Sequence, residues 1–225
     1  MSDGRLLASI VAAGCALAAS PYLARLTLTV PEREDSRWWT GAAPSRTRLL
    51  ATVLPALLLV LLGARAAGWS ALLPAWIALA LFAAPLSVID FKVHRLPNRL
   101  MLPAAVAGAG LLVVAAAARA DWHPLLRAVE AAALVFAIFF LIFLAAPFGL
   151  GDVKFAGLLA GYLGYLSWGY VLYGLLAGFV IASLACLPLL LARRATLKSA
   201  IPLGPALVAG TFLVAGFALV PSYLS

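Results

Sequence analysis

Long apolar runs separated by short polar segments repeat along the whole chain. Runs of about 17–25 apolar residues are long enough to cross a bilayer as helices. No stretch has the pattern of a strand that must pair, and open sheet edges are not tolerated in lipid. We therefore predict an all-α integral membrane protein, a polytopic bundle of about eight transmembrane helices in one domain, residues 1–225. The predicted helices cover residues 6–23, 49–62, 69–89, 100–118, 125–147, 155–167, 169–192 and 203–222.

Composition agrees with this pattern. Hydrophobic residues make up 65% of the chain and charged residues only 11%, and the mean hydropathy is +1.09. A soluble domain has about 25% charged residues, so no room is left for one beside the helices. The net charge of +8 therefore describes membrane topology and does not indicate a nucleic-acid partner.

The basic residues give the orientation, because cytoplasmic loops of membrane proteins carry an excess of Lys and Arg. With the N-terminus outside, twelve of the sixteen Lys and Arg residues fall on inner segments and four on outer ones. We predict a multi-pass protein of the cell inner (plasma) membrane in this orientation. The inner residues are Arg25, Arg33, Arg37, Arg46, Arg48, Lys92, Arg95, Arg99, Lys154, Arg193, Arg194 and Lys198, and the outer ones are Arg5, Arg65, Arg119 and Arg127.

The first apolar run, "LLASIVAAGCALAAS", has some features of a cleavable signal peptide. Cleavage there would leave the Arg-rich loop at residues 25–48 outside, against the charge bias, so we expect the first helix to be retained. The two cysteines, Cys15 and Cys186, each stand alone inside a predicted helix. Neither has the spacing of a zinc site, and we predict neither a metal nor a cofactor.

Three acidic residues lie at or within the predicted helices, where ionisable groups are costly and indicate function by default. Glu130 is near Arg127 and the outer surface, and we assign it a structural role. Asp90 ends the third predicted helix and Asp152 begins the sixth, so both fall at the cytoplasmic face. They could therefore meet across the bundle.

Two carboxylates within hydrogen-bonding distance share one proton, because they cannot both ionise readily. The ionised member can accept a proton from water while its partner donates one to a peptide carbonyl. The pair titrates as a unit, so neither Asp90 nor Asp152 is assigned as the permanent base. For a single aspartate, a helix cap or a salt bridge with Lys92 or Lys154 would be the better interpretation. For two in these positions, we favour a catalytic pair.

The residues around both aspartates fit such a site. Gly149 and Gly151 let the backbone turn sharply and approach a substrate or a partner helix, and Pro97 with Asn98 marks a turn before the fourth predicted helix. His94 and Lys92 are candidates to tune the protonation of the pair, although a solvated or structural role for His94 is the alternative. Lys154 could tune the pair or bind lipid phosphates.

At these residues the chain resembles the type IV prepilin peptidases, membrane aspartyl proteases with a Gly-x-Gly-Asp motif. "DFKVHRLPN", from Asp90 to Asn98, is similar to the family's first motif, an Asp followed by a Pro-Asn or Pro-Asp turn. "GLGDVK", from Gly149 to Lys154, is similar to its second motif, Gly-x-Gly-Asp-x-Lys. "IPLGPAL", from Ile201, resembles the segment that opens the family's last helix.

This resemblance implies an aspartic-type endopeptidase that removes the short basic leader of type IV prepilins or pseudopilins at the cytoplasmic membrane face, just before the apolar pilin helix. Asp90 and Asp152 would be the catalytic residues. Apart from these two aspartates, only the acidic patch Glu32, Glu34 and Asp35 could attract a basic leader. The resemblance leaves open which prepilin is cut and the oligomeric state.

One segment departs from the family. Many members also methylate the new N-terminus of the pilin, using a first cytoplasmic loop with paired Cys-x-x-Cys motifs for zinc. Here the loop at residues 25–48 has no cysteine and no Gly-rich cofactor pattern. We therefore predict a peptidase without methyltransferase activity and without zinc.

Two alternatives compete with this function. A related membrane protease could act on other substrates with the same two aspartates. A proton-coupled transporter could use them as a relay, but such carboxylates are expected near the bilayer midplane and between corresponding halves. The sequence shows no such halves.

Overall fold

The computed structural model describes residues 2–32, 45–93, 96–145, 149–191 and 203–218. Within them the chain forms eight helices, and the prediction of an all-α bundle is confirmed. Six of the eight are long and apolar enough to cross a membrane, so the protein is a multi-pass membrane protein. The helices are α1 (Ser2–Glu32), α2 (Arg46–Ala67), α3 (Leu73–Val93), α4 (Asn98–Arg119), α5 (His123–Ala145), α6 (Leu150–Leu166), α7 (Trp168–Leu191) and α8 (Leu203–Phe217).

Most boundaries fall close to the predicted ones, but α1 is much longer than expected. It was predicted to end at residue 23 and continues to Glu32, so that part of the segment predicted as a loop over residues 25–48 is helical. No glycine directly follows the apolar run, and Ala24, Arg25 and Leu26, which do, are good helix formers that let the helix continue. The division near Ser167 is confirmed, because this residue is fully extended between α6 and α7.

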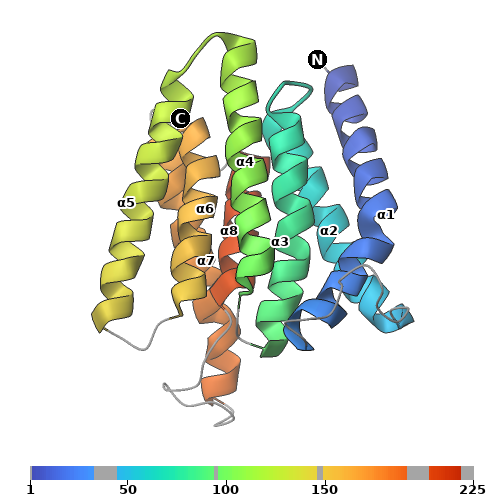
Figure 1. Ribbon diagram of the computed structural model, residues 1–225, viewed down its shortest axis with the longest axis vertical. Coiled ribbons are helices and arrows are strands. Elements are labelled where there is room, and N and C mark those ends of the chain that lie inside the picture. Colours follow the sequence, from blue (N-terminus) through green and yellow to red (C-terminus); the bar gives the residue numbers. More distant parts are fainter. Residues whose placement is uncertain (1, 33–44, 94–95, 146–148, 192–202, 219–225) are drawn as a thin grey trace.

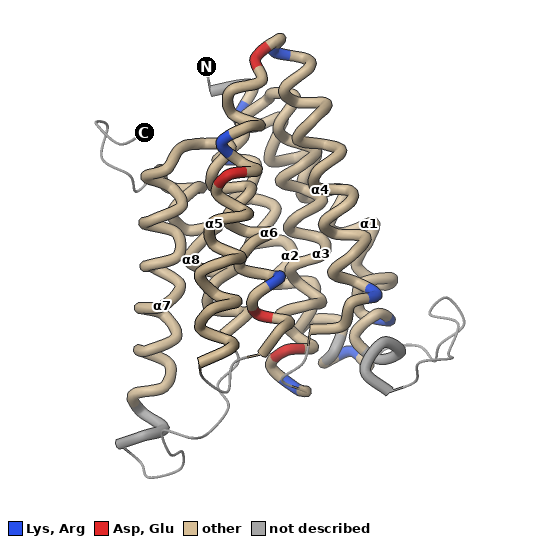
Figure 2. Tube along the Cα trace, turned by 60° about the vertical axis from the view of Figure 1, so that its left-hand side comes forward, with Lys and Arg blue, Asp and Glu red and all other residues tan. Residues whose placement is uncertain are grey.

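Successive helices point in opposite directions, so that each helix begins at the end of the bundle where the previous one stopped (Figure 1). One end carries the start of α1 and the turns that join α2 to α3 and α4 to α5. The opposite end carries the end of α3 and the starts of α4, α6 and α8. Charged positions gather toward these two ends and leave the middle of the bundle apolar (Figure 2).

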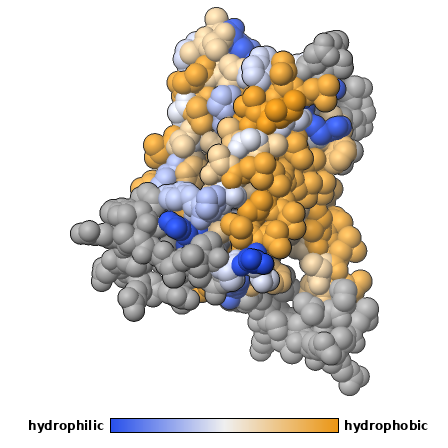
Figure 3. All heavy atoms as spheres, turned by 90° about the vertical axis from the view of Figure 1, so that its right-hand side faces the viewer, coloured by the Kyte–Doolittle hydropathy of each residue, from blue (hydrophilic) through white to orange (hydrophobic). Residues whose placement is uncertain are grey.

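Large apolar side chains cover much of the outer surface, as expected of a surface that faces lipid. On the face that contains α1 and α2, hydrophobic residues form a broad continuous area (Figure 3). Large hydrophobic residues of α4, α5 and α7 are also exposed, so the apolar surface extends around the bundle. Trp69 and Trp122 are also exposed, near the end that holds the N-terminus, which suits aromatic residues at a membrane interface.

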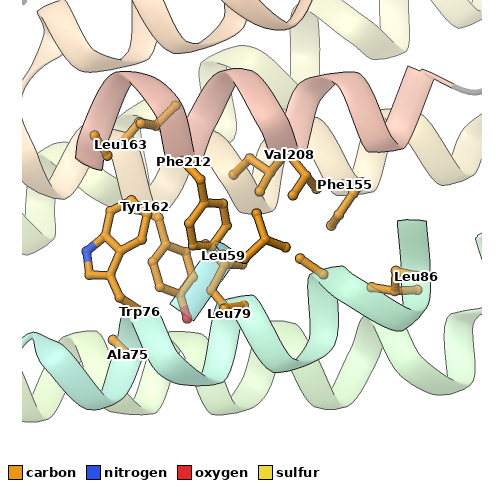
Figure 4. Packing of buried hydrophobic residues seen from close by; sticks show 14 of the residues in the cluster. Leu59, Ala75, Trp76, Leu79, Leu86, Phe155, Tyr162, Leu163, Val208 and Phe212 are labelled. Atoms are coloured by element: carbon orange, nitrogen blue, oxygen red, sulfur yellow. The ribbon is translucent and has the colours of Figure 1, made fainter. Parts of the chain in front are cut away.

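The core is built around α3, α6 and α8. The Trp76 indole meets the rings of Tyr162 and Phe212 edge to face, at centroid distances of 5.8 and 5.3 Å (Figure 4). Such edge-to-face pairs stabilise a core beyond the area that they bury. α6 and α8 are buried along most of their length, so both helices are enclosed by the others.

Glycines bring α6 against α5 and α7 against α8. A Cβ atom on Gly164 would lie 2.5 Å from Ala131 Cβ, and one on Gly178 would lie 2.9 Å from Leu207 Cα. Gly157 and Gly161 also lie against α5. The chain has a Gly-x-x-x-Gly pattern at Gly157 and Gly161 and another at Gly174 and Gly178, and both serve close helix packing within this chain.

Arg127 joins the start of α5 to the end of α6. Its guanidinium donates hydrogen bonds to the carbonyl oxygens of Gly164 (2.6 Å), Tyr165 (3.0 Å) and Leu166 (2.7 Å). These are the last carbonyls of α6, which have no partner within the helix. A cation at this place also offsets the negative end of the helix dipole. Glu130, one turn further along α5, is exposed.

Candidate active site

Both predicted motifs lie at the end of the bundle opposite the N-terminus. Asp90 is in the last turn of α3 and only 4% exposed. Asp152 is in the first turn of α6, and Pro97 and Asn98 begin α4. Acidic positions occur together where α3 ends and α6 begins (Figure 2).

These segments enclose one cleft of about 300 Å³. Asp90 and Asp152 both line it, so the structure brings together two acids that are 62 positions apart in the chain. Asn98 and Lys154 line the same cleft. The two halves of the predicted site therefore form a single space, with the glycines at the start of α6 along one side.

Asp90 is held by the first turn of α8. The backbone N–H of Gly204 donates a hydrogen bond to Asp90 Oδ2 over 3.1 Å. Helix N-termini bind anions through such N–H groups and through the helix dipole. A Cβ atom at position 204 would lie 2.7 Å from the same oxygen, so only glycine leaves room for this contact.

Gly204 was not among the predicted site residues. The signal that could have found it is the segment "IPLGPAL", which was noted only as a similarity to the family's last helix. The sequence alone gives no measure of how close the start of α8 comes to Asp90, because 114 positions separate the two residues.

Asp152 occupies the first turn of α6, where the helix dipole favours a negative charge. Its Oδ1 atom is buried and accepts no hydrogen bond from the part of the chain that the structure describes. A buried acceptor without a partner is unfavourable. The described part of the protein therefore leaves this oxygen unsatisfied.

The two motif glycines are required for space and not for an unusual backbone. Gly149, the residue before α6, has φ −80° and ψ 129°, a conformation open to any residue, so the predicted glycine-specific sharp turn is wrong at this position. A Cβ on Gly149 would lie 3.0 Å from Asp152 Oδ2, and one on Gly151 would lie 2.9 Å from Leu96 Cβ. Gly151 therefore lies close against Leu96, just before the start of α4.

Lys154 and Asn98 connect the two motifs. Lys154 Nζ donates a hydrogen bond to Asn98 Oδ1 over 3.0 Å, and both side chains are exposed. Lys154 therefore contacts the first motif at the edge of the cleft, a contact that neither predicted role included. The bond fixes the start of α4 against the start of α6.

Other candidates lie elsewhere. Lys92 is exposed in the last turn of α3 and lines an apolar groove with residues of α2 and α8, outside the cleft lining. His94 is outside the described residues, as are Glu34 and Asp35 of the acidic patch, and the Glu32 side chain is not described either.

A multi-pass membrane bundle with two acids in one terminal cleft is the arrangement expected of a membrane aspartyl protease. The sequence model of the Type IV leader peptidase family matches residues 75–191, which is just over half of the chain and includes both motifs. The chain belongs to this family and is an aspartic-type leader peptidase. No curated protein matches the chain, and no solved structure does so either.

Proposed function

We propose that Asp90 and Asp152 are the catalytic pair of a leader peptidase that cuts prepilins or pseudopilins at the cytoplasmic membrane face. Family membership supports the activity and the substrate class. The observation that carries the assignment is the shared cleft, in which the aspartates of two separate motifs line one space. No other described acid lines this cleft.

In the proposed reaction, the ionised aspartate accepts a proton from a water molecule as its oxygen attacks the carbonyl carbon of the scissile bond. The protonated aspartate donates its proton to the carbonyl oxygen. The tetrahedral intermediate then collapses and the C–N bond breaks. The leaving amine takes the proton held by the pair, and a hydroxyl of the intermediate returns its proton to the pair, so that the singly protonated pair is regenerated. One proton shared between two carboxyl groups supplies both roles.

The two helix N-termini support this use of the pair. Two adjacent carboxyl groups resist ionisation. The Gly204 N–H and the dipole of α8 favour the charge on Asp90, and the dipole of α6 favours the charge on Asp152. Since both acids receive such support, the base and the acid are properties of the pair.

The charge pattern supports a cytoplasmic position for the cleft. The bundle end that holds Asp90 and Asp152 also holds Lys92, Arg99 and Lys154, in agreement with the Lys and Arg excess expected inside the cell. The segment over residues 25–48 lacks cysteine, and we propose that this protein does not methylate the new N-terminus.

Cleavage of a prepilin by membranes that contain the protein tests the assignment. Asp90→Asn and Asp152→Asn keep the side-chain shape and remove the titrating group. Both should abolish leader removal on a gel while the protein still inserts at wild-type levels. Asp121→Asn, in the exposed turn before α5, is the matched control and should cut normally. Wild-type cleavage by either active-site variant would disprove the pair.

A further inference from the structure

A groove between α4 and α5 begins beside the catalytic cleft and follows α6 into the bundle. Its volume is about 610 Å³, and α6 lies between the two helices at its base (Figure 1). Small residues line it along all three helices, and those of α5 and α6 pack against each other at its base. The small residues are Ala105 and Ala109 of α4, Ala132 and Ala133 of α5, and Gly157 and Gly161 of α6.

The groove is continuous with the catalytic cleft. Lys154 lines both of them, and from there the groove extends along α6 as far as Tyr162. Eight residues of helix span about 12 Å, so the groove can accommodate about two turns of a helical ligand. A chain that lies in the groove would therefore reach the two aspartates at the end marked by Lys154.

Tyr162 lies at the inner end of the groove, and its hydroxyl has no partner among the described residues. Its side chain is 1% exposed, and its hydroxyl accepts and donates no hydrogen bond among the described residues. The hydroxyl lies against α4, since a Cβ atom on Gly108 would be 2.7 Å from it. The hydroxyl is covered by α4, so the groove offers a ligand an apolar surface beside Lys154.

A second apolar groove lies between α2, α3 and α8. Its volume is about 410 Å³, and its lining includes Phe91 and Pro205, which are next to Asp90 and Gly204 in the chain. It shares no lining residue with the catalytic cleft. Continuity with the cleft therefore favours the groove between α4 and α5.

We propose that the groove between α4 and α5 binds the apolar helix of the substrate, the segment that directly follows the scissile bond. The proposal rests on the proposed function, because it names where that substrate docks. The occupant must be apolar, since the lining is apolar apart from Lys154 and the Tyr162 hydroxyl. It must also lie within the bilayer, since the groove extends from the cleft toward the middle of the bundle. A substrate helix meets both conditions and places its cleavable bond at the aspartates.

Photo-crosslinking tests the position of the substrate directly. A photoreactive residue would be placed at Ala109 in the Asp152→Asn protein, which should hold a prepilin without cutting it. The matched control carries the same residue at Ala51, in the groove between α2, α3 and α8. We expect an adduct with the prepilin helix from position 109 and only background from position 51. Equal adducts from both positions, adducts from position 51 alone, or only lipid adducts from position 109 would overturn the proposal.

Filling the groove provides a second test with an independent readout. Ala109→Trp should raise KM and lower kcat/KM for prepilin about tenfold or more, equivalent to about 1.4 kcal/mol. Ala51→Trp should change kcat/KM less than about twofold, because a tryptophan in the other groove leaves the substrate path open. Thermal unfolding in detergent checks that both variants are folded.

The two proposals fail in different ways. If wild-type protein cuts prepilin and both Trp variants cut it equally well, the docking groove is wrong and the catalytic pair stands. If wild-type protein cuts no prepilin, the proposed function fails, and the crosslinks from positions 109 and 51 still decide where an apolar helix binds.

Discussion

An ionisable side chain lies at each end of α6, and the two differ in how the protein satisfies their hydrogen bonds. At the C-terminal end, the Arg127 guanidinium donates to three backbone carbonyls. At the N-terminal end, Asp152 lies beside a second acid, and its Oδ1 takes no hydrogen bond from the described residues. Both charges have the sign that suits the helix dipole. Of the two, only Arg127 is satisfied by the described residues, which indicates a structural role, whereas we propose a catalytic one for Asp152.

The largest expected effect separates these roles. Asp152→Asn should reduce leader cleavage by about 10²–10⁴-fold, the usual contribution of general acid–base catalysis. Its unfolding temperature should stay equal to that of wild type or rise, because the repulsion between two carboxyl groups is removed. Gel-based cleavage rates and thermal unfolding in detergent measure the two quantities. A variant that loses activity only because it unfolds would contradict the comparison.

A smaller loss is expected when the support of Asp90 is disturbed. Gly204→Ala should lower the cleavage rate by about 10- to 100-fold, because the new methyl group must push Asp90 Oδ2 away from its donor, a displacement of the kind that weakens catalysis strongly. Gly110→Ala is the matched control, since a Cβ atom at that position meets nothing within 4 Å. Equal rates for the two variants would show that the contact between α8 and Asp90 has no catalytic role.

At the other end of α6 the effect should appear in stability. Arg127→Met removes the guanidinium and leaves the carbonyls of Gly164, Tyr165 and Leu166 without it. We expect the free energy of unfolding to fall by about 1.5–3 kcal/mol, the range for hydrogen bonds to a charged group. The cleavage rate of the protein that stays folded should change little. A selective loss of activity without loss of stability would contradict a structural role.

The smallest effect concerns the bond between Lys154 and Asn98. Lys154→Met and Asn98→Ala should each slow cleavage about two- to fivefold, and the double variant should be no slower than the worse single one, because partners in one contact are not additive. A double-variant cycle on kcat/KM measures this coupling. Fully additive losses would show that the two residues act separately.

Local patterns in the sequence predicted much of this molecule. The apolar runs predicted eight helices, because length and hydropathy are enough to define a span. The two motifs placed Asp90 and Asp152 at helix ends on one side of the membrane, because two crossings lie between the end of the third helix and the start of the sixth. These features depend on the composition of short segments, which the sequence displays directly.

The features that the sequence did not predict depend on contacts between distant segments. The Gly204 N–H reaches Asp90 only because α8 packs beside α3, and the Arg127 guanidinium reaches α6 only because glycines draw α5 and α6 together. The predicted end of the first helix at residue 23 was wrong for a different reason. A helical backbone can continue after the apolar run has ended, and α1 continues to Glu32. Packing geometry and propensity, and not hydropathy, decide these points.

Because Gly204 donates a hydrogen bond to Asp90, the proposed catalytic cleft is completed only late in synthesis. Chains are made from the N-terminus, so α3 and α6 emerge with both aspartates well before α8 exists. Until the start of α8 arrives, Asp90 lacks the N–H donor that holds it in the cleft. A chain in the membrane that still lacks α8 therefore has an incomplete site, and insertion of α8 completes the support of the acid that we propose to be catalytic.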